Sequence, residues 1–199
     1  MKLLIIVSLI LTLAMPAFNG CSSVTLKAQE EQEEDDSWKS EDYQGDKVES
    51  RLRFYKEKYE MKFEDPFEVV WNSILEAIQN TGCMIATSSS RQTDEGFYRG
   101  VIKSDFCVFS VGEDSTYSVL QKYSFDMPVI PSAKWESGRI QHKFIVKELE
   151  DGSIDVLHTS EMSGWEGRVT SQVHFWQSSG MFEHFLHEDI KAIIAGKSE

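Results

Sequence analysis

The run His184-Phe185-Leu186-His187-Glu188 near the C-terminus has side chains that could bind a metal ion. On a helix, residues three or four positions apart are surface neighbours, and imidazole together with carboxylate suits zinc. The order of the histidines and the glutamate is not that of a zinc-protease helix, and Lys191 lies on the same helix face. The spacing also identifies no third ligand. The sequence therefore favours a solvated helix face, and we expect neither a metal site nor a cofactor.

Two further histidines, His142 and His158, fall in predicted strands that flank Asp151-Gly152, a dipeptide typical of hairpin turns. Pairing the strands through this turn places Ile145 opposite His158, which predicts a half-buried histidine that packs or hydrogen-bonds. No nucleophile elbow, phosphate-binding loop or dinucleotide fingerprint occurs. We therefore expect no catalytic residue and no enzyme, although a hydrolase stays open because catalytic residues need not be adjacent in sequence.

The chain has three cysteines, Cys21, Cys83 and Cys107. If Cys21 is acylated, the other two form an even pair, and in an oxidising compartment such a pair favours a disulfide. The alternative is two small buried thiols. A nucleophilic cysteine would need a nearby cation to lower its pKa, and nothing local supplies one.

Two short segments combine Trp, Glu, Gly and Arg and lie just before predicted strands: Trp135-Glu136-Ser137-Gly138-Arg139 and Ser163-Gly164-Trp165-Glu166-Gly167-Arg168. As a pair of loops, they could form an aromatic and arginine rim for a partner, since Trp and Arg are favoured in interface hot spots. The candidate partner surface is then Trp135, Arg139, Trp165 and Arg168. The alternative is turn glycines, a buried Trp and structural Arg–Glu pairs.

The elements that would position these residues begin with a strand near Tyr59–Phe63 and a helix whose apolar stripe runs from Phe67 to Ile78. Asp65 suits the N-cap, Pro66 the first helical position, and Gly82 a left-handed end. The apolar residues recur at helical spacing: Phe67, Val70, Trp71, Ile74, Leu75 and Ile78. Together they predict an amphipathic helix that packs on a sheet.

Further strands are expected at Cys83–Ser89, Phe97–Ser104, Tyr117–Phe125, Arg139–Glu150, Ser153–Met162 and Arg168–Trp176. A second helix spans Gly180–Ala195. Its expected buried face contains Phe182, Phe185, Leu186, Ile190, Ile193 and Ile194, and the opposite face contains His184, His187, Glu188 and Lys191. The fold class is α+β: an antiparallel sheet of about six to seven strands, covered on one face by two helices in a helix-grip-like order.

The chain is acidic, with a formal net charge of −13, and its acids concentrate in residues 22–50 around Glu30-Glu31-Gln32-Glu33-Glu34-Asp35-Asp36. Few apolar groups and strong self-repulsion predict a disordered tether over residues 21–50, and the alternative is a segment that binds calcium or a basic partner. Residues 51–199 have the size of one domain. We expect no nucleic-acid partner, because no basic patch is visible in the sequence.

Residues 1–20 are typical of an export signal: Lys2 is followed by the apolar run Leu3–Leu13, which is too short to span a bilayer. Phe18-Asn19-Gly20-Cys21 resembles the lipobox of bacterial lipoproteins. That resemblance implies a lipid on Cys21, and Ser22 after it implies the outer membrane. The alternative is a secreted protein with an unmodified Cys21.

The lipobox, the acidic N-terminal stretch and the element order are together similar to the lipoprotein subunit of the outer-membrane barrel-assembly machinery. No functional residue carries over from that resemblance. We therefore expect an envelope protein anchored through Cys21, with its domain facing the periplasm or the cell surface. Its expected role is a non-enzymatic docking or assembly accessory with a protein partner. The alternatives are a binder of an apolar small molecule or lipid, in a cavity between sheet and C-terminal helix, and a hydrolase.

Overall fold

The structure is a computed structural model that describes residues 52–56 and 58–197. The expected signal peptide, the lipid site at Cys21 and the acidic tether lie outside these residues. The elements, in chain order, are β1 (Tyr59–Phe63), α2 (Phe67–Asn80), β2 (Ile85–Gln92), β3 (Tyr98–Ser104), β4 (Cys107–Val111), the 3-10 turn η1 (Gly112–Asp114), α3 (Tyr117–Lys122), β5 (Trp135–Glu148), β6 (Ile154–Glu166), β7 (Gln172–Trp176) and α4 (Met181–Lys197).

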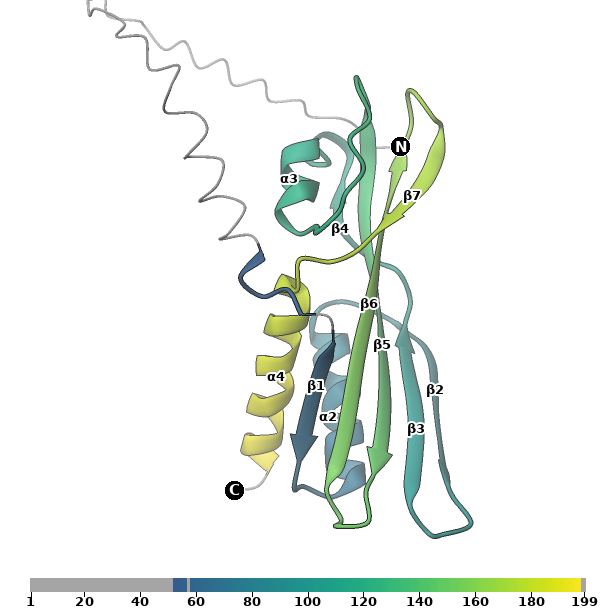
Figure 1. The fold of residues 1–199 in the computed structure, drawn as a ribbon, viewed down its shortest axis with the longest axis vertical. Coiled ribbons are helices and arrows are strands. Elements are labelled where there is room, and N and C mark those ends of the chain that lie inside the picture. The colour runs from purple at the N-terminus through teal and green to yellow at the C-terminus, as the bar shows by residue number, and fades with distance from the viewer. Residues whose placement is uncertain (1–51, 57, 198–199) are drawn as a thin grey trace, which may run out of the picture. The chain divides into compact units, whose positions relative to one another are not determined.

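Seven strands form a single sheet in which every pairing is antiparallel (Figure 1). One half has the order β1-β6-β5-β3-β2, and in the other half β4 pairs with β5 and β7 pairs with β6. The hairpin of β5 and β6 therefore runs through both halves. The expected α+β fold class, with six to seven antiparallel strands and helices on one face, is confirmed.

Helix α2 follows the apolar pattern that predicted it. Val70, Ile74 and Ile78 are fully buried, and Gly82 ends the segment with a φ of 79°. The helix begins one residue later than expected, because Pro66 rather than Asp65 takes the N-cap position and its carbonyl accepts from the amides of Val69 and Val70. The apolar stripe of α2 was therefore predictable from the sequence, whereas its N-cap residue was not.

Two hydrophobic clusters lie along the β5–β6 hairpin. The first packs α2 and α4 on the sheet through residues such as Ile78, Phe144 and Ile190. The second packs α3 on the other half through Leu120, and its remaining buried members are Met127, Trp135, Ile140, Met162 and Trp176. Cys107 is partly buried against both clusters.

All three helices cover the same face of the sheet. Gly138, Phe144 and Val146 point to one side of β5, because alternate residues of a strand share a face. A Cβ at Gly138 would lie 2.4 Å from Leu120 of α3, while Phe144 and Val146 pack with α2 and α4. The opposite face, which contains Arg139, Lys143 and Lys147, is left open among the described residues.

The strand predicted at Tyr117–Phe125 is wrong. Tyr117–Lys122 forms helix α3, which is capped by Thr116: its side-chain oxygen accepts from the amide of Val119. A threonine N-cap stabilises the first turn of a helix, and in so short a segment this outweighs the strand propensity of the residues. The strand of this region is β4 instead, immediately after Asp105 and Phe106.

The predicted hairpin register is wrong by one position. His158 lies opposite Phe144, not Ile145, because the loop holds three residues with Gly152 in the left-handed region at a φ of 81°. The amide of Leu149 donates to the carbonyl of Ser153 and closes this loop. Three-residue hairpin loops commonly place glycine in that conformation. As a result, the His158 side chain is fully buried against the helices.

Within the described part of the chain, no helix is both long enough and apolar enough to cross a membrane.

Candidate functional site

A chain of three hydrogen-bonded histidines crosses from the sheet to α4. His142 Nδ1 on β5 lies 3.0 Å from His158 Nε2 on β6, and His158 Nδ1 lies 2.9 Å from His187 Nε2 on α4. His142 and His158 are buried, and the His158 ring stacks on Phe144 with centroids 4.0 Å apart. Since each bond needs one proton, two tautomer patterns satisfy the whole chain, one donating toward α4 and one toward β5.

Burial sets the charge state of these imidazoles. Loss of solvation lowers the pKa of His142 to about 4, and the pKa of His187 to about 4 with help from Lys191 and Lys56. Loss of solvation, followed by repulsion from its two neighbours, lowers the pKa of His158 well below the usual value of 6.5. At neutral pH the three imidazoles are therefore uncharged.

A buried carboxyl group, Glu183, lies one turn before His187 on α4. It accepts from the hydroxyls of Ser160 and Ser178, with the Ser178 Oγ–Glu183 Oε2 distance at 2.8 Å. The side chain has no exposed surface, and this burial raises its pKa against the lowering effect of both serines. Glu183 is thus a carboxyl group whose neutral form is favoured by the fold.

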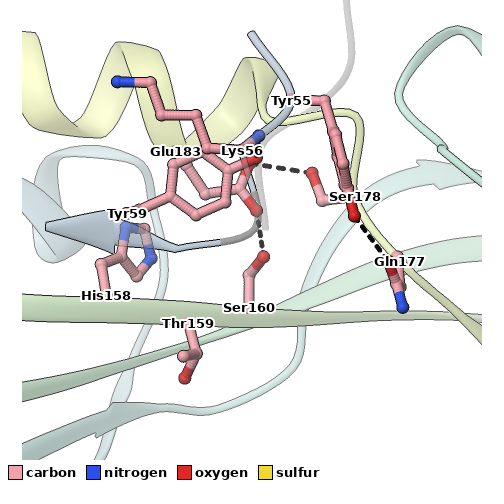
Figure 2. A pocket seen from close by; sticks show the side chains of 9 residues that line it. All are labelled: Tyr55, Lys56, Tyr59, His158, Thr159, Ser160, Gln177, Ser178 and Glu183. Carbon is pink, nitrogen blue, oxygen red and sulfur yellow. Dashed lines mark hydrogen bonds between the residues drawn. The ribbon is translucent and has the colours of Figure 1, made fainter. Parts of the chain in front are cut away.

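A cavity of about 320 Å³ opens beside Glu183, and Figure 2 shows its lining. The lining residues are Tyr55, Lys56, Tyr59, His158, Thr159, Ser160, Gln177, Ser178 and Glu183. Desolvation raises the pKa of Tyr59 to about 12, to which the charge of Glu183 also contributes. The walls thus offer hydroxyl, amide and carboxyl groups to a small polar molecule.

Gly180 allows the chain near Phe54 and Tyr59 to pack closely against the start of α4. Its φ is 86°, and a Cβ there would lie 2.2 Å from the carbonyl oxygen of Phe54 and 2.4 Å from the Tyr59 hydroxyl. A side chain at this position would push the segment of residues 52–56 away from the start of α4. The close approach of that segment therefore depends on a glycine.

The hydroxyl and imidazole groups around the cavity do not form a nucleophile–base pair. Ser160 bonds to Glu183, and the His158 ring nitrogens bond to His142 and His187. Within the described residues, no serine hydroxyl bonds to an imidazole nitrogen, which is the contact that activates a serine nucleophile. Glu183 and the histidines instead join β5 and β6 to α4 and to the segment that precedes it.

The fold points the side chains of the run His184–Glu188 toward different partners. His184 stacks on Phe54 with ring centroids 4.2 Å apart, whereas His187 turns inward to His158. Glu188 instead pairs with Lys191 at 2.9 Å. No group of three or more His, Cys, Asp or Glu side chains in the described ranges could hold a metal ion.

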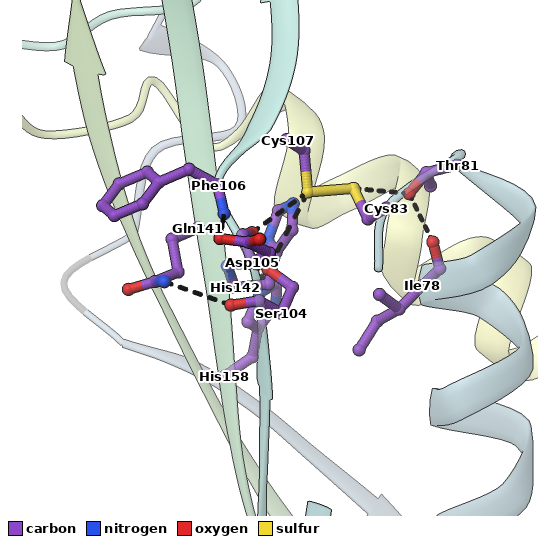
Figure 3. The surroundings of a disulfide bond; sticks show 10 residues. All are labelled: Ile78, Thr81, Cys83, Ser104, Asp105, Phe106, Cys107, Gln141, His142 and His158. Atoms are coloured by element: carbon purple, nitrogen blue, oxygen red, sulfur yellow. Dashed lines mark hydrogen bonds between the residues drawn. A yellow bond between two sulfur atoms is a disulfide. The ribbon is translucent and has the colours of Figure 1, made fainter. Parts of the chain in front are cut away.

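A disulfide joins Cys83, just after α2, to Cys107 at the start of β4, with Cα atoms 5.3 Å apart (Figure 3). Ser104 lies beside it: its hydroxyl accepts from the His142 amide at 2.9 Å, and its carbonyl accepts from Gln141 Nε2. The bridge therefore connects the end of a helix to the strand region that carries the histidine chain.

The four residues of the expected partner surface are separated by the fold. Trp135 is buried in the second cluster with 4% of its surface exposed, so its assignment to an exposed rim is wrong. The first segment and the second as far as Glu166 belong to strands rather than loops, with Trp135 on the helix-covered face and Trp165 on the open face. Arg139 is exposed on the open face, and Arg168 is exposed in the turn after β6.

Glu166 organises that turn. It is buried and accepts from the amides of Lys134, Arg168, Val169 and Thr170. Burial by itself would raise its pKa, but these amide donors hold the pKa of Glu166 well below its usual range. Backbone amides, and not the arginine of the Arg–Glu pair considered for this segment, are therefore the donors to Glu166.

The open face carries an exposed apolar surface across β4, β5, β6 and β7. Two rows of register partners cross it: Val108–Arg139–Ser163–Phe175 and Val111–Ser137–Trp165–Val173. We call Val108, Val111, Trp165, Val173 and Phe175 the apolar patch. Trp165 has 36% of its surface exposed and the other four have 44% or more, whereas Ser137 and Ser163 between them are buried.

Sequence reasoning missed the buried polar groups of α4. Glu183, Leu186, Ile190 and Ile194 are its buried residues, so the inward face passes through Glu183 and close to His187. The expected face included Phe185, which is 56% exposed. The spacing of i, i+4, i+7 and i+11 over Glu183, His187, Ile190 and Ile194 was the signal for the correct face.

No protein-family model matches the chain, and no curated protein matches it either.

Proposed function

We propose that this protein is a lipid-anchored docking module of the bacterial envelope, held to the membrane through Cys21 and binding a protein partner with the open face of its sheet. The observation that carries this proposal is the apolar patch around Arg139. Exposed apolar surface gathered in one place is characteristic of interaction sites. In this reading the helices stabilise the sheet from one side and leave the other side for recognition.

The composition of the patch fits a protein partner. Trp, Phe and Arg are enriched in the centres of protein interfaces, and Arg139, Trp165 and Phe175 lie on the three adjacent strands β5, β6 and β7 of the same surface. The buried serines Ser137 and Ser163 let the large side chains lie close to the backbone. A shallow, mostly apolar surface of this kind suits a flat partner.

The alternative of a carrier for an apolar molecule has less support. The space between the sheet and α4 is filled by residues with little or no exposed surface, including Phe144, Leu186 and Ile190. The cavity beside Glu183 is open and has polar walls. A hydrolase likewise lacks the serine–imidazole contact described above.

A photo-crosslinking residue placed at Val173 tests the proposal in cells that make the full chain. We expect a discrete adduct with one envelope protein, lost when Trp165→Ala is added. With that protein purified, Trp165→Ala should weaken binding by about ten-fold or more, as for an interface hot spot. The matched controls are Phe185→Ala and a crosslinker at Phe185, since Phe185 is as exposed as Phe175 but lies on α4 instead of the sheet.

Two results would overturn the proposal. One is an adduct at Phe185 as strong as that at Val173. The other is unchanged binding by Trp165→Ala and Phe175→Ala chains whose thermal unfolding matches that of the unmodified protein.

A further inference from the structure

The open face also gathers positive charge on this acidic chain. Three adjacent strands, β2, β3 and β5, present five exposed cations there: Arg91, Arg99, Lys103, Lys143 and Lys147. We call them the basic stripe. The premise that the chain has no basic patch is therefore wrong for this surface, because strand pairing brings together cations that are far apart in sequence.

The cations of the basic stripe form two rows across the strands. One row is Arg91–Arg99–Lys147, and the other contains the register partners Lys103 and Lys143. Side chains directly opposite on antiparallel strands have Cβ atoms about 5 Å apart, and like charges in such pairs destabilise a sheet. The two rows therefore repel internally unless negative charge lies between their members.

The described residues do not supply that charge. Within residues 52–56 and 58–197, no member of the basic stripe forms an ion pair. This holds even for Lys147, whose register partner on β6 is Asp155. A ligand that brings carboxylates or other anionic groups to the stripe would therefore relieve the repulsion within each row.

An apolar row separates the two cationic rows. The register partners Val101 and Ile145 lie between them and are only partly exposed. Together with Arg91, Arg99 and Lys147, they line an open hollow of about 380 Å³. The hollow thus has an apolar floor with cations at its rim.

This alternation matches the period of an extended peptide. Successive rows are two residues apart along each strand, or about 7 Å, and alternate side chains of an extended chain have the same separation. A peptide lying along β5 would place three alternate side chains over the cationic, apolar and cationic rows. Carboxylates suit the outer two positions, since Arg binds them through paired hydrogen bonds, and an apolar side chain suits the middle one.

We propose that the partner of the open face presents to the basic stripe an extended acidic segment of the pattern acidic–x–apolar–x–acidic. This inference rests on the docking function proposed above, because the class of partner is taken from it. The stripe and the apolar patch lie on one face, where Arg139 and Lys143 share the open side of β5. In such a complex the patch supplies apolar contact, and the stripe selects the partner by its charge.

An anionic membrane surface fits the stripe less well. A bilayer would meet the ends of the cationic side chains, whereas Val101 and Ile145 lie on the floor between them. Apolar residues contribute to membrane binding when they enter the boundary between headgroups and acyl chains. The central apolar row would therefore contribute nothing to such a contact.

Peptide binding to the mature chain, residues 21–199 with Cys21→Ser, tests the proposal in solution. The probe is an end-capped synthetic peptide, Thr-Glu-Thr-Ile-Thr-Glu-Thr, titrated to millimolar concentration against the ¹⁵N-labelled protein. We expect saturable NMR shifts of backbone amides, centred on Val101 and Ile145. The dissociation constant should rise several-fold between about 20 mM and about 200 mM salt, because screening weakens attraction. A peptide that met only the overall negative charge of the chain would show the opposite sign.

Matched peptides test the charge and its spacing. A peptide with glutamine in place of both glutamates should give no saturable shift. The peptide Thr-Thr-Glu-Glu-Ile-Thr-Thr has the same composition, but its adjacent glutamates point to opposite sides of an extended chain. It should bind several-fold more weakly than the probe.

Matched variants test the surface. Arg99→Gln with Lys143→Gln should weaken binding of the probe by about five-fold or more, as expected for two exposed charge contacts. Lys122→Gln with Lys191→Gln changes the net charge by the same amount on helices α3 and α4, and should leave the affinity unchanged.

Several results would overturn the proposal. They are no saturable shift with the probe, equal binding of either control peptide, and an equal effect of the two double variants. Sedimentation with vesicles containing about 30% phosphatidylglycerol is a further check. If Arg99→Gln with Lys143→Gln abolishes vesicle binding while the probe gives no shift, the stripe belongs to a membrane surface instead.

The two proposals fail in different ways. An adduct at Val173 together with no binding of the probe would leave the docking function standing and overturn the acidic segment. Binding of the probe at the stripe without a Val173 adduct would support the acidic segment as a ligand and overturn the docking role of the apolar patch.

Discussion

His158 on β6 and His187 on α4 are joined by a hydrogen bond of 2.9 Å between ring nitrogens Nδ1 and Nε2. The bond links the sheet to the C-terminal helix through two groups that the fold keeps neutral. Protonating either ring places a charge in a buried site next to another imidazole. The attachment of α4 is therefore sensitive to acid.

We predict that the free energy of unfolding falls as pH drops from about 6.5 toward about 4. The unfolded chain binds protons on these histidines from about pH 6.5 downward, whereas burial delays binding in the folded chain until about pH 4 for His142 and His187. The folded pKa is lowered, so the stabilisation is complete above 6.5 and is lost on acidification. Each excess proton contributes about 1.4 kcal/mol per pH unit.

His187→Asn tests this assignment, because its amide can still donate to His158. Chemical denaturation across this pH range should give a slope smaller by about one proton. His174→Asn is the control, since that ring bonds to Thr170 and not to the histidine chain. Lys56, Lys191, His184 and Glu188 also act on His187, so they must be kept. An unchanged slope in His187→Asn would place the proton uptake elsewhere.

Glu183→Gln should gain stability relative to the unmodified chain as pH rises from 4.5. Burial raises the pKa of Glu183 in the folded chain, so the unfolded chain ionises first as the pH rises. The folded state therefore loses stability until the pH exceeds the folded pKa of Glu183. Glutamine keeps the shape and removes this loss. The check is the difference in unfolding free energy between the two proteins, measured from pH 4.5 to 8.

Glu188→Gln is the matched control on the same helix. A hydrogen bond and the charge of Lys191 lower the pKa of Glu188, so its contribution is already complete above 4.5 and is lost only on further acidification. The Glu188→Gln difference should therefore stay flat from pH 4.5 to 8. If Glu183→Gln is equally flat, the carboxyl of Glu183 is not held in the neutral form by the fold.

Helix α2 and the β5–β6 hairpin were predictable because their apolar residues repeat at a single period. The Glu183 site was not, since choosing Phe182 and Phe185 as inward residues rotates the helix by about 100° and exposes Glu183. His158 needed the correct hairpin register, which depends on whether the loop holds two or three residues. The pairing of Lys103 with Lys143 and of Arg99 with Lys147 joins strands whose partner residues are 40 and 48 positions apart, which no local pattern encodes.

The disulfide between Cys83 and Cys107 should stabilise the domain by about 3 kcal/mol, because it closes a loop across a sequence separation of 24. Thermal unfolding of a Cys21→Ser chain with and without reductant measures the effect. A chain that also carries Cys83→Ala and Cys107→Ala should match the reduced protein and show no response to reductant. Equal unfolding temperatures in oxidised and reduced protein would contradict the prediction.

Cys21→Ser should release the protein from membranes or leave it as uncleaved precursor. Two or more acyl chains hold a protein stably on a bilayer, and a hydroxyl cannot accept the thioether-linked lipid. Fractionation and intact mass measurement give the readout, with Cys83→Ser as the control thiol. A mature chain that begins before residue 21 and carries no lipid would refute the anchor.

The length of the β5–β6 hairpin has a consequence for cooperativity. These two strands are the main structure shared by the two hydrophobic clusters, so each half of the domain can open while the other stays closed. Amide hydrogen exchange should then divide into two groups: one around Phe144 and Val156, protected by α2 and α4, and one around Ile140 and Met162, protected by the six-residue helix α3. The second group, which backs the apolar patch, exchanges first. The surface proposed for docking would then belong to the half of the domain that opens at the lower free energy.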